Sequence, residues 1–175
     1  MRRLGPLSLI ALLIACRPSS EASSPTAVVQ RFYATTISQR VTGAPTEPQL
    51  VELSPFVSDT LRALLAAARR RSDADAAREP NEKPSFAEGD LFSSLFEGPN
   101  AVEVLADSAR GDLRVATVKM TSTGATPPVT WVDRVLLVRR GEGYVIDDIE
   151  YGGQWDFSSK GTLRAGLVAG LAAPP

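Results

Sequence analysis

The sequence predicts an α+β protein in which N-terminal helices pack on a curved, four-stranded antiparallel sheet and a C-terminal helix follows the sheet. Two observations support this class. Apolar residues in the first half of the chain recur every three or four positions, which is the period of an amphipathic helix. The second half changes to short runs rich in valine, threonine and isoleucine with glycine and proline between them, which is typical of strands joined by hairpins.

Two helices are expected before the sheet. The first starts with Ser24 as N-cap and Pro25 at the first helical position, which is a favoured pair, and it stops before Gly43. The second starts at Ser54 and runs to about Ala77 along a stripe of leucines that we expect to be buried.

The region between the helices and the sheet is expected to be irregular. Residues 69–71 are three arginines near the end of the second helix, and we expect them to be solvated and favoured by the negative pole of the helix dipole. Residues 79–90 contain two prolines and a glycine, which predicts a loop. Residues 91–96 are a short apolar turn or helix that holds Phe92 and Phe96 four positions apart.

The four strands are joined in order by hairpins, which predicts an antiparallel meander. Along one strand, apolar Val118 and Met120 alternate with Thr117 and Lys119, so one face of the sheet should be apolar and the other mixed. The expected strands are residues 101–105, 113–122, 129–139 and 143–151, and the last helix is residues 162–171, with Leu163, Leu167, Val168 and Leu171 on its apolar face.

The start of the chain resembles a bacterial lipoprotein signal. Arg2 and Arg3 precede an apolar stretch too short to span a bilayer, and the run Leu13-Ile14-Ala15-Cys16 ends it. This pattern predicts export, cleavage after residue 15, and attachment to a membrane through acyl chains on Cys16. An ordinary secretory peptide or an uncleaved anchor is the alternative. Aspartate after the cysteine tends to retain enteric lipoproteins at the inner membrane, so Arg17 implies, by that resemblance, the periplasmic side of the outer membrane.

These features predict a signal peptide over residues 1–15, a lipidated cysteine and polar tether over residues 16–24, and one α+β domain over residues 25–172. Cys16 is the only cysteine, so acylation leaves no thiol for a disulfide. The chain has no histidine, which excludes a Ser-His-Asp triad and a histidine zinc site, and we expect neither metal nor cofactor. Nothing resembles a basic, aromatic nucleic-acid surface.

Three stretches resemble a family of uncharacterised exported bacterial proteins, a domain of unknown function often found on lipoproteins. They are residues 29–33 on the first helix, residues 90–92 after the loop, and residues 144–149 on the last strand, where Tyr144 replaces a frequent tryptophan. The order of elements also resembles the cone-shaped α+β fold of nuclear transport factor two. The resemblance implies a fold and a subcellular location, and it implies no reaction.

Asp147, Asp148 and Glu150 form the densest acidic cluster. Neighbouring residues on a strand point to opposite faces, so Asp148 and Glu150 should share one side. Two carboxylates this close could work as a catalytic acid and base. Alternatively, these residues finish the strand or pair with Arg134 or Arg139 on the neighbouring strand.

Asp90 and Trp155 are the candidate ligand-binding residues. Asp90 precedes an apolar segment, so it either contacts a ligand or caps the amide of Phe92 or Ser93. Trp155 lies between glycines outside the strands, and it belongs to an aromatic set that lines a pocket or an interface, or simply packs in the core.

The leading hypothesis is a lipid-anchored, non-catalytic binding or interaction module of the cell envelope, with an envelope protein or a small ligand as its partner. The alternative is a small isomerase-like or hydrolase-like enzyme that uses Asp148 and Glu150. A third hypothesis is an assembly protein that forms a homodimer through its exposed sheet face.

Overall fold

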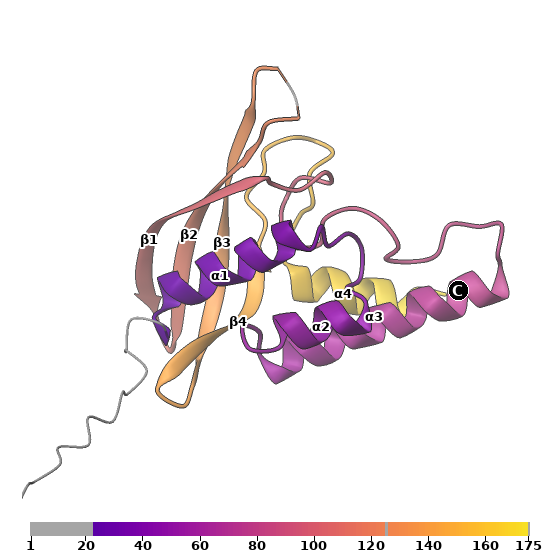
Figure 1. Ribbon diagram of the computed structural model, residues 1–175, viewed down its shortest axis with the longest axis horizontal. Coiled ribbons are helices and arrows are strands. Elements are labelled where there is room, and N and C mark those ends of the chain that lie inside the picture. Colours follow the sequence, from indigo (N-terminus) through magenta and orange to yellow (C-terminus); the bar gives the residue numbers. More distant parts are fainter. Residues whose placement is uncertain (1–22, 125, 175) are drawn as a thin grey trace, which may run out of the picture.

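Four helices and four strands make up residues 23–124 and 126–174, which the computed structural model describes (Figure 1). Cys16, the predicted signal peptide and most of the predicted tether lie outside these residues. The helices α1 (Pro25–Ser38), α2 (Glu47–Leu53) and α3 (Asp59–Arg78) precede the sheet, and α4 (Leu163–Ala172) follows it. The α+β class predicted from the sequence is confirmed.

The sheet is an antiparallel meander with strand order β1-β2-β3-β4, as the hairpin pattern predicted. β1 is longer than expected and carries a bulge between Val104 and Ala106. A bulge shifts the pairing and bends the strand, which adds to the curvature of the sheet. The strands are β1 (Ala101–Arg110), β2 (Leu113–Ser122), β3 (Val129–Arg140) and β4 (Gly143–Glu150).

The core lies between the helices and one face of the sheet (Figure 1). On β2, Val118 and Met120 are fully buried while Lys119 is exposed, so the predicted alternation is confirmed. Phe32 of α1 makes edge-to-face contacts with Tyr33 and with Phe92 of the irregular segment, each with ring centroids 5.1 Å apart. Aromatic pairs in this geometry add to the free energy of burial, so they fix α1 and the segment around Phe92 against each other.

The predicted start of the second helix is wrong. Ser54 is the C-cap of the short helix α2, and α3 begins at Asp59 with Ser58 as its N-cap, where Ser58 Oγ accepts a hydrogen bond of 3.1 Å from Leu61 N. The start of α2 was missed although Gln49 Oε1 accepts a hydrogen bond of 2.9 Å from Thr46 N, which is half of a capping box. The α1 start with Ser24 as N-cap is confirmed.

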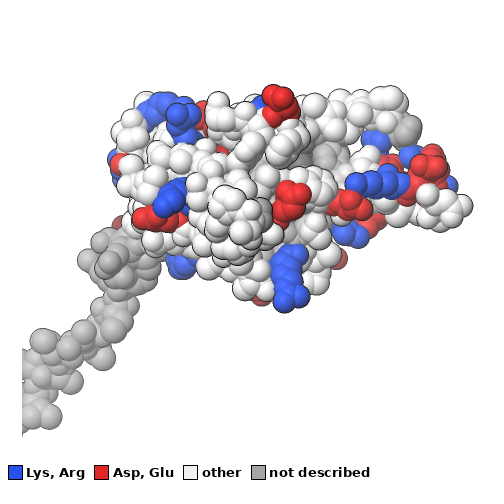
Figure 2. Space-filling view, turned by 90° about the horizontal axis from the view of Figure 1, so that it is seen from above, with Lys and Arg blue, Asp and Glu red and all other residues white. Residues whose placement is uncertain are grey.

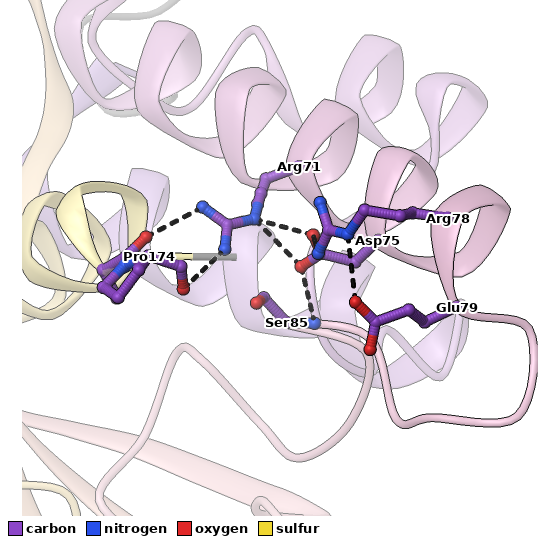
Figure 3. Close-up of polar contacts among 7 residues, drawn as sticks. Arg71, Asp75, Arg78, Glu79, Ser85 and Pro174 are labelled. Carbon is purple, nitrogen blue, oxygen red and sulfur yellow. Dashed lines mark hydrogen bonds and ion pairs between the residues drawn. The ribbon is translucent and has the colours of Figure 1, made fainter.

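The expectation of a solvated arginine triplet is also wrong for its last member. The Arg71 side chain is only 17% exposed, and its Nε lies 2.9 Å from Asp75 Oδ1. Asp75 also accepts hydrogen bonds from Arg78 (2.9 Å) and from the amide of Ser85 (3.2 Å), while Arg71 donates to the carbonyls of Ala173 and Pro174 (Figure 3). This polar cluster therefore holds the loop after α3 and the end of α4 to α3.

The predicted C-terminal helix is confirmed, with Thr162 as its N-cap. Leu163 and Leu167 are buried, but Val168 is 54% exposed, so it does not belong to the apolar face that faces the core. Within the described part of the chain, none of the helices combines the length and apolar content needed to cross a bilayer.

Candidate functional site

Asp148 and Glu150 both have partners within the protein. Glu150 Oε1 accepts a hydrogen bond of 2.8 Å from Arg110 Nη2, and its Oε2 lies 3.9 Å from Arg134 Nη1. Asp148 Oδ1 accepts from the amides of Ile149 (2.8 Å) and Arg164 (2.9 Å), which places it at the N-terminal end of α4. Neither carboxylate lines any of the four principal grooves found on the described residues. Both carboxylates are thus engaged by partners from other parts of the chain.

Asp90 begins the irregular segment of residues 90–98. Its Oδ1 accepts a hydrogen bond of 2.7 Å from Phe92 N, and its own amide donates to the Phe96 carbonyl at 2.8 Å. Burial raises the pKa of the Asp90 carboxyl from 3.8 to about 6, although the hydrogen bonds from Phe92 and Ser93 oppose the rise. The negative charge of nearby Asp133 raises it further. This carboxylate is therefore partly desolvated and costly to ionise.

Asp90 is one of the residues that line a surface groove of about 640 Å³. One wall is the C-terminal end of α1, with Thr36 and Arg40, and the other is formed by residues 88–90 and 96–100. Three carboxylates line this groove against one arginine, Arg40. It is the one surface hollow among the four that includes a candidate residue from the sequence.

Asp133 is a fully buried carboxylate that the sequence analysis missed. It accepts hydrogen bonds from Ser94 N (2.8 Å), Gly152 N (2.8 Å) and Trp131 Nε1 (3.1 Å), and one from Ser94 Oγ. Because the donors come from three parts of the chain, the carboxylate ties residues 90–98 and the segment after β4 to the sheet. One signal was present: Asp133 interrupts the apolar positions of β3 that alternate toward the core.

Trp155 lies on the segment that follows β4, beside the segment that contains Asp90. The two segments are joined directly, because Ser94 Oγ accepts a hydrogen bond of 3.0 Å from Gly153 N and Tyr151 Oη donates to the Leu91 carbonyl at 2.6 Å. Burial raises the pKa of the Tyr151 phenol, which keeps it a donor. The structure thus brings both candidate ligand-binding residues to neighbouring loops at one end of the sheet.

The aromatic side chains after β4 form a short stack. Trp155 packs edge to face on Trp131 with centroids 5.9 Å apart, and Phe157 stacks on Trp155 at 6.0 Å with an interplanar angle of 13°. Phe157 is 72% exposed. Lys160 Nζ donates to the carbonyls of Trp155 (2.7 Å) and Gly153 (3.1 Å), which closes the loop that carries the rings. We call Trp155 and Phe157 the aromatic surface.

The aromatic surface lies at the end of the molecule opposite to the start of α1. Ser23 lies beside Gly143, the first residue of β4, whereas the aromatic surface follows the last residue of that strand. β4 has 8 residues, and at about 3.3 Å per residue it spans about 26 Å. Figure 1 shows the same separation, with the segment after β4 in the upper part of the view, below the β2–β3 turn, and the start of α1 at the left.

Charge is sparse on the side of the molecule that carries this segment. Figure 2, seen from above Figure 1, shows a mostly uncharged central surface with scattered single charges, while opposite charges gather at the end where α3 stops. In that end region Lys83 pairs with Glu88 at 2.5 Å and Arg78 with Glu79 at 3.1 Å. The described residues contain no group of three or more acidic side chains arranged to hold a metal ion.

Comparisons with known proteins give a relative whose own function is not characterised. Over 143 residues the chain is 28% identical to "Uncharacterized lipoprotein YbjP" of Escherichia coli (strain K12), which covers 82% of this chain and 75% of that protein. No family model matches the sequence. Among solved structures, the Tae3–Tai3 effector–immunity complex of the type VI system from Ralstonia pickettii contains a chain that aligns with a TM-score of 0.46 and 19% identity, over 77% of this chain and 98% of that chain.

Proposed function

We propose that this protein is a lipid-anchored, non-catalytic binding module of the bacterial cell envelope, and that the aromatic surface contacts its partner. In this proposal residues 1–15 are removed, Cys16 carries the acyl chains, residues 16–24 form the tether, and residues 25–172 are the binding domain. The similarity to a lipoprotein supports the anchor. Arg17 supports the periplasmic side of the outer membrane.

The observation that carries the proposal is an aromatic stack whose outer ring, Phe157, is exposed on a loop whose backbone is firmly held. Large aromatic side chains supply most of the binding free energy at protein interfaces, and they do so at low entropic cost when their loop is already ordered. Here Asp133, Ser94 and Lys160 hold the loop by hydrogen bonds, and Phe157 still presents most of its surface to solvent. Core packing requires no such exposure.

The position of the aromatic surface supports a protein partner rather than the anchoring membrane. The proposed tether enters the domain at Ser24, about 26 Å along β4 from the aromatic loop. The proposed tether joins the domain at the start of α1, so the aromatic surface lies at the end of the domain farther from the point of attachment. The cone-shaped arrangement stays part of this proposal, and the helices that cover one face of a curved sheet support it.

The anchor is tested with the full-length chain and its Cys16→Ser variant in Escherichia coli. We expect radioactive palmitate to label the unaltered chain and not the variant, and globomycin to block maturation of the unaltered chain. The variant should be absent from the membrane fraction. If the variant carries the label, or stays with membranes to the same extent, the anchor is wrong.

The partner surface is tested by a photo-crosslinking amino acid at the exposed position Gln154 in intact cells. We expect one adduct, at least fivefold weaker when Phe157→Ala is added. Val168→Ala removes a comparably exposed apolar side chain from α4 and serves as the matched control. An adduct between two copies of the chain identifies a homodimer as the partner. No adduct, or one insensitive to Phe157→Ala, overturns the role of the aromatic surface.

A further inference from the structure

The groove beside Asp90 has features that neither the anchor nor the aromatic surface uses. Its wall carries a carboxylate that forms none of the ion pairs found among the described residues. The hydrogen bond from Phe92 engages Asp90 Oδ1. Asp90 Oδ2 lies against Gly98, because a Cβ added at Gly98 would lie 2.6 Å from that oxygen.

An aromatic ring lies in the same groove. Phe96 lines it with about half of its surface exposed, and Lys83 Nζ already lies 5.9 Å from its ring centroid. An ammonium group at that distance is attracted by the negative face of the ring. A carboxylate and an exposed aromatic ring in one hollow are the two groups that proteins use to bind organic cations.

Two glycines let the backbone pack closely against these two groups. Gly89 (φ +80°) and Gly98 (φ +70°) both adopt the left-handed conformation that side chains disfavour. A Cβ at Gly89 would lie 2.5 Å from the Phe96 ring, and one at Gly98 would press on Asp90. Any larger residue at either position would therefore displace the ring or the carboxylate from its place in the groove wall.

We propose that the groove formed by the end of α1 and residues 88–100 binds an organic cation with a primary ammonium group, which Asp90 pairs with and Phe96 covers. Glu97 adds negative charge to the rim, whereas Glu88 is already paired with Lys83. Arg40 is the only cationic side chain that lines the groove. The net charge of the groove is therefore negative, which favours a cation. This inference is independent of the anchor and of the aromatic surface.

The desolvation of Asp90 favours the binding of a cation beside it. Burial raises the pKa of Asp90 to about 6, so near pH 7.5 the carboxylate is ionised in surroundings that disfavour its charge. A bound ammonium group supplies the missing opposite charge in a medium of low effective dielectric, where the attraction exceeds that in water.

The inference is tested by NMR titration of the full-length, ¹⁵N-labelled chain in detergent micelles. The probes are Nα-acetyl-lysine-N-methylamide, the neutral isostere Nα-acetyl-norleucine-N-methylamide, and n-butylamine. We expect the lysine amide to shift the amide signals of Gly89, Asp90 and Gly98 saturably at pH 7.5, and the norleucine amide to leave them unchanged. Binding of n-butylamine as well identifies a free amine as sufficient; its failure identifies a peptide lysine as the preferred source.

Two comparisons decide the role of Asp90. Asp90→Asn keeps an oxygen for the Phe92 amide, and we expect it to weaken lysine-amide binding at least tenfold, while Asp73→Asn in the groove between α2 and α3 leaves it unchanged. In the unaltered protein, affinity should fall about tenfold between pH 7.5 and pH 5, because Asp90 becomes protonated. Equal binding of the norleucine amide, or an affinity independent of both pH and Asp90→Asn, overturns the proposal. If Asp90→Asn disturbs the loop, the pH dependence and the comparison with the norleucine amide, both measured on the unaltered protein, still test whether Asp90 binds the ammonium group.

Discussion

Replacing Asp90 by asparagine should stabilise the folded protein at neutral pH. The folded-state pKa of Asp90 is about 6, against 3.8 for an ordinary aspartate. The folded protein therefore binds more protons than the unfolded chain between about pH 4 and pH 6, and its stability falls as the pH rises through this window. Above about pH 6 the full loss of folding stability is present, and it no longer changes with pH.

The size of the effect follows from the pKa. At about 1.4 kcal/mol for each pH unit, a rise from 3.8 to about 6 corresponds to about 3 kcal/mol, which is the upper limit for the cost of the ionised carboxylate. Asparagine avoids that cost and retains an acceptor for Phe92 N, but a neutral acceptor makes a weaker hydrogen bond than a carboxylate. We therefore expect Asp90→Asn to be about 1–3 kcal/mol more stable than the parent at pH 7.5, and nearly equal at pH 4.

The measurement is the free energy of unfolding in urea at pH 4, 5, 6 and 7.5 for the parent and the variant. Because many carboxylates titrate in this range, the difference between the two proteins is the informative quantity. Asp112→Asn in the exposed β1–β2 turn is the matched control, and its difference should stay near zero throughout. The reasoning is refuted if Asp90→Asn is less stable at pH 7.5, or if its difference from the parent does not change between pH 4 and pH 7.5.

Three further predictions concern stability. Asp133→Ala leaves the buried amides of Ser94 and Gly152 and the indole N–H of Trp131 without their acceptor, so it should cost at least about 3 kcal/mol in urea unfolding; a loss below about 1 kcal/mol would contradict the assigned network. Gly98→Ala should cost about 1–3 kcal/mol more than Gly111→Ala, because both positions have positive φ but only a Cβ at Gly98 meets Asp90; equal losses would show that no such contact exists. Hydrogen bonds from Ser85, Arg71 and Arg78 hold the pKa of Asp75 well below 3.8, so its contribution is present above that pH and lost as the pH falls below it. Asp75→Asn should therefore lower the melting temperature at pH 7 and approach the parent near pH 2, and a constant difference would exclude this linkage.

Several elements could be predicted because their signals are local. The Ser24 cap, the C-terminal helix, the hairpin turns and the alternation along β2 lie in short stretches of sequence, and the structure confirms them. Only the start of the second helix was predicted wrongly, because two serines, Ser54 and Ser58, offer similar caps. The choice depends on a distant residue: Ser58 Oγ donates to Asp147 Oδ1 at 2.6 Å, which fixes the start of α3 beside β4.

The candidate site was predicted less well. Asp90 and Trp155 were selected for their positions beside an apolar segment and between glycines, but the sequence could not show that their loops lie side by side. Asp133 joins those loops, and its partners Ser94 and Gly152 are 39 and 19 residues away along the chain. Similarly, Arg110 reaches Glu150 across 40 positions, so the neighbours of the acidic cluster could not be predicted from strand alternation alone.

The sequence by itself determined the α+β class, the order of the strands and the prediction of a lipid anchor, because periodicity, turn residues and the Cys16 pattern act over a few neighbouring positions. The tertiary structure decided which carboxylates form ion pairs, which others, such as Asp90 and Asp133, are wholly or partly buried without a cationic partner among the described residues, and which aromatic rings remain exposed. These properties depend on burial and on partners brought together by folding, and both arise only when distant segments exclude water from the same space.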